Sequence, residues 1–266
     1  MDGLTEKASI VNGFIDKGFD AVRKLDWKKC ADVGGRYSSA FGMIAFQLFG
    51  VVGFVASIVC MCRYKGATGT FAGLAFGLLV LGVAAAYIGS KLMTMLDKCI
   101  ENNKTCVSSP AVMDAIACLL VLAGVSALVV DIRLEQYADG ILMLAAALLL
   151  AIAAVCPDVV NVEIRKDAKA GQELVGIVSF LAKAILRIAP FAWFAGAAFC
   201  SVGLLVCLGS RDLDVRLAET ILRILPFALL PVAAYAGFLV VNLVIDLVGS
   251  ILSIQGKPGD GEGKQA

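Results

Sequence analysis

The amino-acid sequence predicts an all-α fold, a polytopic bundle of about six transmembrane helices with amphipathic helices at the membrane interface. Apolar residues make up 60% of the 266 residues, only 17% are charged, and the mean hydropathy is +0.88. Soluble domains contain fewer apolar and more charged residues. The apolar residues also gather in nearly charge-free blocks of about 20 residues, the length that a helix needs to cross about 30 Å of hydrocarbon.

The chain is expected to have three parts. Residues 1–38 form a cytoplasmic, amphipathic N-terminal segment, residues 39–254 the transmembrane helical domain, and residues 255–266 a polar C-terminal tail. In the first part, apolar residues recur on one helical face, which predicts a helix lying in the membrane interface. They are Val11, Phe14, Ile15, Val22 and Leu25. A helix packed on the inner loops of the same protein would show this pattern too.

Six apolar blocks are bounded by charges or by Gly and Pro, and each predicts one membrane-spanning helix. They cover residues 40–62, 71–90, 112–130, 140–156, 188–208 and 225–247. The third and fourth blocks are separated only by the residues from Asp131 to Asp139, a connection short enough to predict an antiparallel hairpin. A second amphipathic stretch, residues 174–188, runs directly into the fifth block.

A local repeat begins the last two spans. The segment Leu181–Ala192 recurs as Leu217–Ala228, and each copy contains an Arg followed by a Pro. We expect a polar approach helix and then the Pro near the first turn of the span, where its missing N–H needs no partner. The copies should point in opposite directions, as inverted repeats do in transporters. Alternatively, both are ordinary sequences for the start of a span, with Arg at the headgroups.

The distribution of positive charge predicts that both termini are cytoplasmic. With the N-terminus inside, 17 of the 23 Lys and Arg residues fall in inner segments and 6 in outer loops. Positively charged loops resist translocation, so this bias sets the orientation. One motif opposes it, because Asn103-Lys104-Thr105 is a glycosylation sequon in a connection that the charge bias assigns to the inside.

The sequence offers little for catalysis or metal binding. It contains no histidine, the commonest general base and metal ligand, and its nine cysteines are too scattered for a zinc site. It also lacks a glycine-rich phosphate loop and a serine nucleophile motif. We therefore expect a protein that is not an enzyme and has no cofactor or metal. A net charge of +1 without a basic run argues against a nucleic-acid partner.

Few polar residues fall inside the predicted spans. Asn242 and Asp246 lie four residues apart and share a helix face. Together with Arg187 and Arg223 of the repeat, they are the candidates for a polar pathway through the membrane. In the simpler interpretation, Asp246 lies just outside the hydrocarbon and marks the end of the last span.

Small residues predict close packing of the helices. Gly50 and Gly53 lie in the first block, and Gly73-x-x-x-Gly77 in the second has the spacing that lets two backbones approach closely. We predict a non-enzymatic structural membrane subunit or scaffold that oligomerises through Gly/Ala-rich helix faces. Its partners would be membrane lipid and either copies of itself or other membrane subunits. The alternative is a channel or transporter with a pathway near the Pro-broken last two spans.

Overall fold

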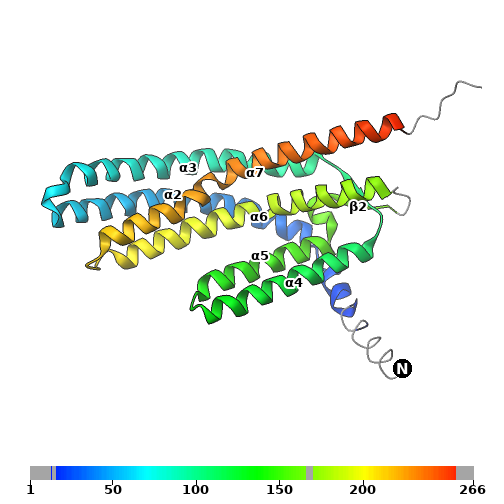
Figure 1. The fold of residues 1–266 in the computed structure, drawn as a ribbon, viewed down its shortest axis with the longest axis horizontal. Helices are drawn as coiled ribbons and strands as arrows, with labels where there is room; N and C mark the ends of the chain where they lie inside the picture. Colours follow the sequence, from blue (N-terminus) through cyan, green and yellow to red (C-terminus); the bar gives the residue numbers. More distant parts are fainter. Residues whose placement is uncertain (1–12, 14–15, 166–169, 256–266) are drawn as a thin grey trace, which may run out of the picture.

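The computed structural model describes residues 13, 16–165 and 170–255, and these residues form a bundle of long helices (Figure 1). The elements are α2 (Trp27–Arg63), η1 (Lys65–Ala67), α3 (Thr68–Asn102), β1 (Thr105–Val107), α4 (Pro110–Arg133), α5 (Tyr137–Val155), η2 (Pro157–Val160), β2 (Val162–Ile164), α6 (Ala170–Cys207) and α7 (Leu213–Gln255). Residues 16–23 are also helical. The expected C-terminal tail, from residue 256, and residues 1–12 and 14–15 of the N-terminal segment lie outside the described residues.

The prediction of an all-α membrane bundle is confirmed. Five helices are long and apolar enough to cross a membrane, namely α2, α3, α4, α6 and α7, and α5 contains a shorter apolar stretch, Asp139–Val155. Their outer faces are apolar, as contact with lipid requires. Val206 and Leu222, for example, are 79% and 73% exposed within the chain.

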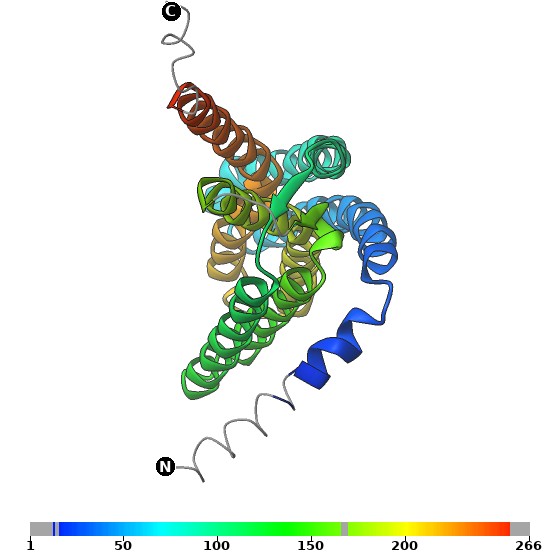
Figure 2. The same cartoon turned by 90° about the vertical axis from the view of Figure 1, so that its right-hand side faces the viewer.

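Successive helices run in opposite directions, so both described ends of the chain lie at one end of the bundle (Figure 1). The α2–α3 and α6–α7 connections lie at the opposite end. There the Arg63 guanidinium donates a hydrogen bond to the Ser210 carbonyl, and the Tyr64 hydroxyl lies 3.3 Å from an Asp214 carboxylate oxygen. Helices α2, α3, α6 and α7 form one group, and the α4–α5 hairpin leans away from it (Figure 2).

Trp193 of α6 lies at the centre of the main group. Its ring is fully buried and stacks on Phe46 with 5.1 Å between ring centroids. A side-chain methyl group at Gly42 of α2 or at Gly89 of α3 would overlap this ring. The two glycines therefore form the notch that lets three helices close around one tryptophan.

A second close contact joins α2 to α3. A methyl group at Gly82 would lie 2.7 Å from the Phe46 carbonyl oxygen, and one at Gly50 would lie 3.2 Å from the Leu78 carbonyl oxygen. Only hydrogen at these positions allows the two backbones to approach so closely. Gly50 is one of the predicted packing positions, whereas Gly82 was not among them.

The α4–α5 hairpin was predicted from its short connection and is present. Residues 134–136 join the helices, and Glu135 has a φ of 60°, in the left-handed region. The helices touch where a methyl group at Gly124 would meet the Ala147 side chain, 2.5 Å from its Cβ.

The prolines of the repeat do not lie in the first turns of helices, contrary to the expectation. Pro190 is in the interior of α6 and Pro226 in the interior of α7, which also contains Pro231 beyond the repeat. Each approach segment and the span that follows it form one continuous helix. Pro removes one backbone donor, and a long helix packed against neighbours tolerates that loss. The last two spans are therefore not broken at their prolines.

Several helices are longer than a membrane is thick. Helix α2 has 37 residues and extends for about 55 Å at ~1.5 Å per residue. Here "membrane-spanning segments" means the stretches without Asp, Glu, Lys or Arg, which include residues 37–62 of α2, 66–90 before and within α3, and 188–207 of α6. The charged remainders, residues 27–36, 91–102 and 173–187, are called the polar extensions.

Candidate functional site

Two buried cations lie one helical turn apart on the polar extension of α6. Lys183 is 0% exposed and Arg187 8% exposed. Residues four apart share a helix face, so both side chains point in the same direction, toward the polar extensions of α2 and α3. Burying a charged group is costly unless it is paired and hydrogen-bonded, so the partners of these two residues define the site.

Arg187 joins three helices through an ion-pair cluster. Its guanidinium contacts the Asp32 carboxylate of α2, and its Nη1 lies 3.2 Å from Oδ1 of Asp97 on α3. The two carboxylates keep part of their solvent contact, with side chains 39% and 33% exposed, whereas the side chain of Arg187 is 9% exposed. We call Asp32, Asp97 and Arg187 the Arg187 cluster.

The Arg187 cluster is more negative than a simple pair, because one cation faces two carboxylates. Burial raises the pKa of the Asp97 carboxyl, while the nearby Arg187 charge acts to lower it. Among the described residues, the Arg187 Nε atom has no hydrogen-bond partner. The cluster therefore holds the helices together without satisfying every polar atom.

Lys183 ties α6 to the two connections on either side of the α4–α5 hairpin. Its ammonium group donates to the Asn103 carbonyl, to the Thr105 hydroxyl at 2.9 Å and to the Asn161 carbonyl at 3.4 Å. The Asn161 side chain in turn donates to the carbonyls of Ile100 and Glu101, 3.2 and 2.8 Å away, at the end of α3. We call Lys183, Asn103, Thr105 and Asn161 the Lys183 joint.

The Lys183 joint also aligns a small parallel sheet. Strand β1 pairs with β2 in the register Thr105 to Val162 and Val107 to Ile164. Burial lowers the pKa of the Lys183 ammonium to about 8, whereas the oxygens that accept its hydrogen bonds favour the charged form.

The chemistry of both groups is that of a structural joint. Both cations of the site are directed at carboxylate, carbonyl or hydroxyl oxygens of this chain, and their contacts link different segments of the chain. The described residues contain no group of three or more His, Cys, Asp or Glu side chains placed to hold a metal ion.

The structure separates the predicted packing glycines into two sets. Gly50 and Gly53 face α3, where a methyl group at Gly53 would lie 2.9 Å from a Leu78 side-chain carbon. Gly73 and Gly77 face outward, and no described atom lies within 4 Å of a methyl group built there. Within the described residues, Gly50 and Gly53 therefore take part in helix packing, whereas Gly73 and Gly77 do not.

The candidates for a polar pathway do not form one group in the structure. Arg187 pairs with Asp32 and Asp97, and Arg223 is exposed on α7. The Asn242 side chain donates to the Phe238 carbonyl of its own helix at 2.9 Å, and Asp246 is exposed. Among the described residues, no hydrogen bond or ion pair joins Arg187 to the other three, so a pathway through them stays a prediction.

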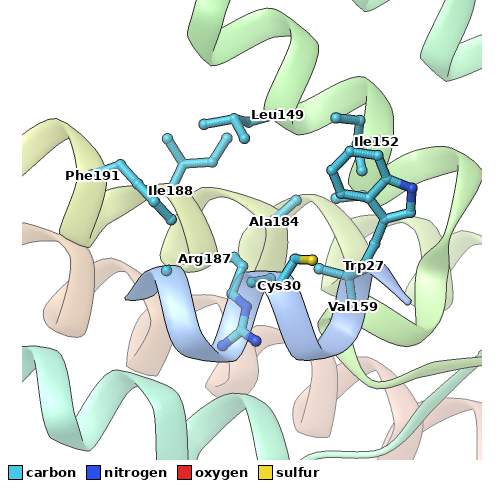
Figure 3. A pocket seen from close by; sticks show the side chains of 12 residues that line it. Trp27, Cys30, Leu149, Ile152, Val159, Ala184, Arg187, Ile188 and Phe191 are labelled. Atoms are coloured by element: carbon cyan, nitrogen blue, oxygen red, sulfur yellow. The ribbon is translucent and has the colours of Figure 1, made fainter. Parts of the chain in front are cut away.

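An apolar cavity lies beside the site, between α2, α5 and α6 (Figure 3). Its volume is about 210 Å³. Leu149 and Ile152 line it from α5, and Trp27, Cys30 and Phe191 are among the residues of the other walls.

Sequence analysis missed Asp32, Asp97, Lys183 and Asn161 as members of a site. Lys183 had been treated only as an inner-side charge of the amphipathic stretch before the fifth block, and Arg187 as the Arg of the repeat and a candidate for the polar pathway. Their spacing of four was the available signal, because two cations one turn apart on a half-buried helix need partners. Nothing in the sequence indicated which acidic residues those partners would be.

The chain matches no protein family, no curated protein and no solved structure. Any proposal about its function therefore starts from its own residues.

Proposed function

We propose that this protein is a non-enzymatic structural subunit or scaffold of a membrane, and that it assembles with copies of itself or with other membrane subunits through α3. The observation that supports this most directly is the outward glycine face of α3. An added methyl group would meet no described atom of another segment within 4 Å at Gly69, Gly73 and Gly77 of α3, or at Gly66 of the preceding η1.

This face has the features of a helix-packing surface. Large apolar side chains flank the glycines, with Phe76 65% and Val80 63% exposed. In a bilayer, helices associate through close backbone approach rather than through the hydrophobic effect, and glycine permits that approach. Gly50 and Gly82 already serve this purpose inside the chain, so the outward glycines offer the same kind of contact to a second helix.

The use of polar groups also favours a structural role. Within the membrane-spanning segments, the Ser57 hydroxyl donates to the Gly53 carbonyl at 2.8 Å, and the Ser201 hydroxyl donates to the Ala197 carbonyl at 2.7 Å. The buried cations lie outside these segments, where Arg187 is paired with two carboxylates and Lys183 donates hydrogen bonds to carbonyl and hydroxyl oxygens. A conduit needs polar groups directed at its pathway, whereas these groups are directed at the backbone of the protein.

The test is the oligomeric state of purified protein in lipid nanodiscs. We expect the wild type to form an oligomer and the double substitution Gly73→Ile, Gly77→Ile to shift it toward monomer, because the branched side chains separate the backbones. Gly203→Ile with Gly237→Ile is the matched control, since these glycines are equally open on α6 and α7. A monomeric wild type, or the same loss in both variants, contradicts the proposal.

We also propose that both termini are cytoplasmic, on the charge distribution. Epitope tags at residues 1 and 266 should be protected from protease added outside intact cells and become accessible on permeabilisation. Glycan on Asn103 would place the α3–β1 connection outside and reverse the orientation. The substitution Asn103→Gln in a parallel sample shows whether a mass shift comes from that residue.

A further inference from the structure

The cavity between α2, α5 and α6 is lined almost entirely by apolar atoms. Trp27 and Ile152 lie on one side of the view in Figure 3 and Ile188 and Phe191 on the other, with Leu149 at its upper edge. The indole N–H of Trp27 donates to the Val22 carbonyl at 2.8 Å, so the ring presents an apolar surface to the cavity. Any occupant therefore meets almost no hydrogen-bonding groups.

The one charged residue of the cavity wall does not attract an anion into it. Arg187 lines the cavity, but its guanidinium is directed away from Leu149 and Ile152 and lies against Asp32 and Asp97 (Figure 3). Two carboxylates more than neutralise this cation. The part of the occupant that enters the cavity is therefore uncharged.

The cavity lies at the depth where hydrocarbon gives way to headgroups. Ile188 and Phe191 are at the start of the membrane-spanning segment of α6, whereas Trp27 and Cys30 belong to the polar extension of α2. Tryptophan favours this boundary. The wall residues Ile152, Ile188 and Phe191 are half-buried, so the cavity is open to the surroundings of the helices.

Neither filling this cavity with water nor leaving it empty is energetically favourable. A water molecule needs two to four polar partners, which these walls do not provide, and an unfilled apolar volume forfeits contacts with the atoms around it. Exposed Lys28 and Lys29 directly follow Trp27, so they place positive charge at the level of the Trp27 end of the cavity, on other faces of α2 than the one that lines it. An apolar chain joined to a negatively charged headgroup matches both features.

We propose that this cavity binds one acyl chain of an anionic membrane phospholipid, non-covalently, with its phosphate at the level of Lys28 and Lys29. The lipid fills the space between the α4–α5 hairpin and the main group of helices. The proposal is independent of the oligomeric state of the protein.

Trp27 provides the readout. Phosphatidylglycerol with brominated acyl chains is added at a few molecules per protein to detergent-solubilised protein, because bromine quenches tryptophan fluorescence only at contact. We expect saturable quenching that Trp27→Phe abolishes, since Trp193 is fully buried in the main group. Quenching that rises without saturation, or persists in Trp27→Phe, overturns the proposal.

Substitutions that fill the cavity test whether the acyl chain of the lipid lies inside it. Ala153→Leu enlarges the α5 wall and Ala31→Leu the α2 wall, and each should reduce quenching at least twofold. Ala145→Leu, on the exposed face of α5, is the matched control and should leave quenching unchanged. If one of these two variants elutes as misfolded protein, the quenching of the other variant tests the proposal. Equal quenching in the filled and control variants contradicts the assignment.

Mass spectrometry distinguishes the sources of an acyl chain. Under native conditions we expect one retained phospholipid in the wild type and fewer in Ala153→Leu. Under denaturing conditions the polypeptide should have its unmodified mass. An acyl adduct that survives denaturation and is removed by hydroxylamine would place the chain on the Cys30 thiol instead and overturn the non-covalent proposal.

Discussion

Arg187 and Arg223 occupy equivalent positions in the two copies of the repeat but have different surroundings. Arg187 is 8% exposed and bridges Asp32 and Asp97, whereas Arg223 is exposed on the surface of α7. The same local sequence therefore serves two purposes. Burial, rather than the motif, determines which arginine stabilises the fold.

This difference gives a matched pair of substitutions. Arg187→Leu should destabilise the protein by about 3 kcal/mol, near the lower end of the range for breaking a buried pair because both carboxylates keep solvent contact. Arg223→Leu should change stability by less than about 0.5 kcal/mol, as is usual for exposed positions. Thermal unfolding followed with a thiol-reactive dye measures both, since Cys60 and Cys200 are buried in the folded protein. Equal shifts in midpoint would show that the Arg187 cluster contributes nothing.

A substitution at Asp246 distinguishes the scaffold hypothesis from the channel hypothesis. It is exposed, and the nearby Asn242 side chain bonds to its own helix. We expect no ion current from protein reconstituted in planar bilayers, and the same oligomeric state for Asp246→Asn as for wild type. A current that Asp246→Asn abolishes would make the channel hypothesis the leading one, because a carboxylate on a pore wall raises the local cation concentration.

At the scale of the elements, glycine positions decide how the helices pack. Gly42 and Gly89 form the notch for the Trp193 ring, and Gly50 and Gly82 bring α2 and α3 into backbone contact. By contrast, Gly73 and Gly77 have the better-known spacing but meet no other segment of the described part of the chain. Spacing along one helix indicates a possible contact, and the partner across the contact determines whether it forms.

The close contact of Gly42 and Gly89 with the Trp193 ring leads to a prediction about stability. Gly89→Ala should destabilise the protein by about 1–3 kcal/mol, the usual cost of overpacking, because the new methyl group overlaps a ring enclosed by three helices. Gly237→Ala, where the space is open, should be neutral or stabilise α7 by up to about 1 kcal/mol through helix propensity. The thiol-dye unfolding assay compares the two. A milder effect at Gly89 than at Gly237 would contradict the role of the notch.

At the scale of the whole molecule, the helices and the hairpin could be predicted from the sequence, because each depends on a continuous apolar block or a short connection. The contacts of Arg187 could not, since Asp97 and Asp32 lie 90 and 155 residues away in the chain. The position of the prolines was also misjudged. A long helix stabilised by its neighbours continues through a Pro that would end an isolated one.

The Lys183 joint has a consequence for the order of biosynthesis. The carbonyls at the end of α3 receive their hydrogen bonds from Asn161 and Lys183, which follow Ile100 and Asn103 by 61 and 80 residues. At ~5–20 residues per second, a ribosome needs about 4–16 s to add 80 residues. During that interval the first two helices can already be inserted while the end of α3 lacks its partners. A nascent chain with a defect at Asn161 or Lys183 would therefore reach the membrane with its early helices in place and then be open to quality-control proteases at this connection.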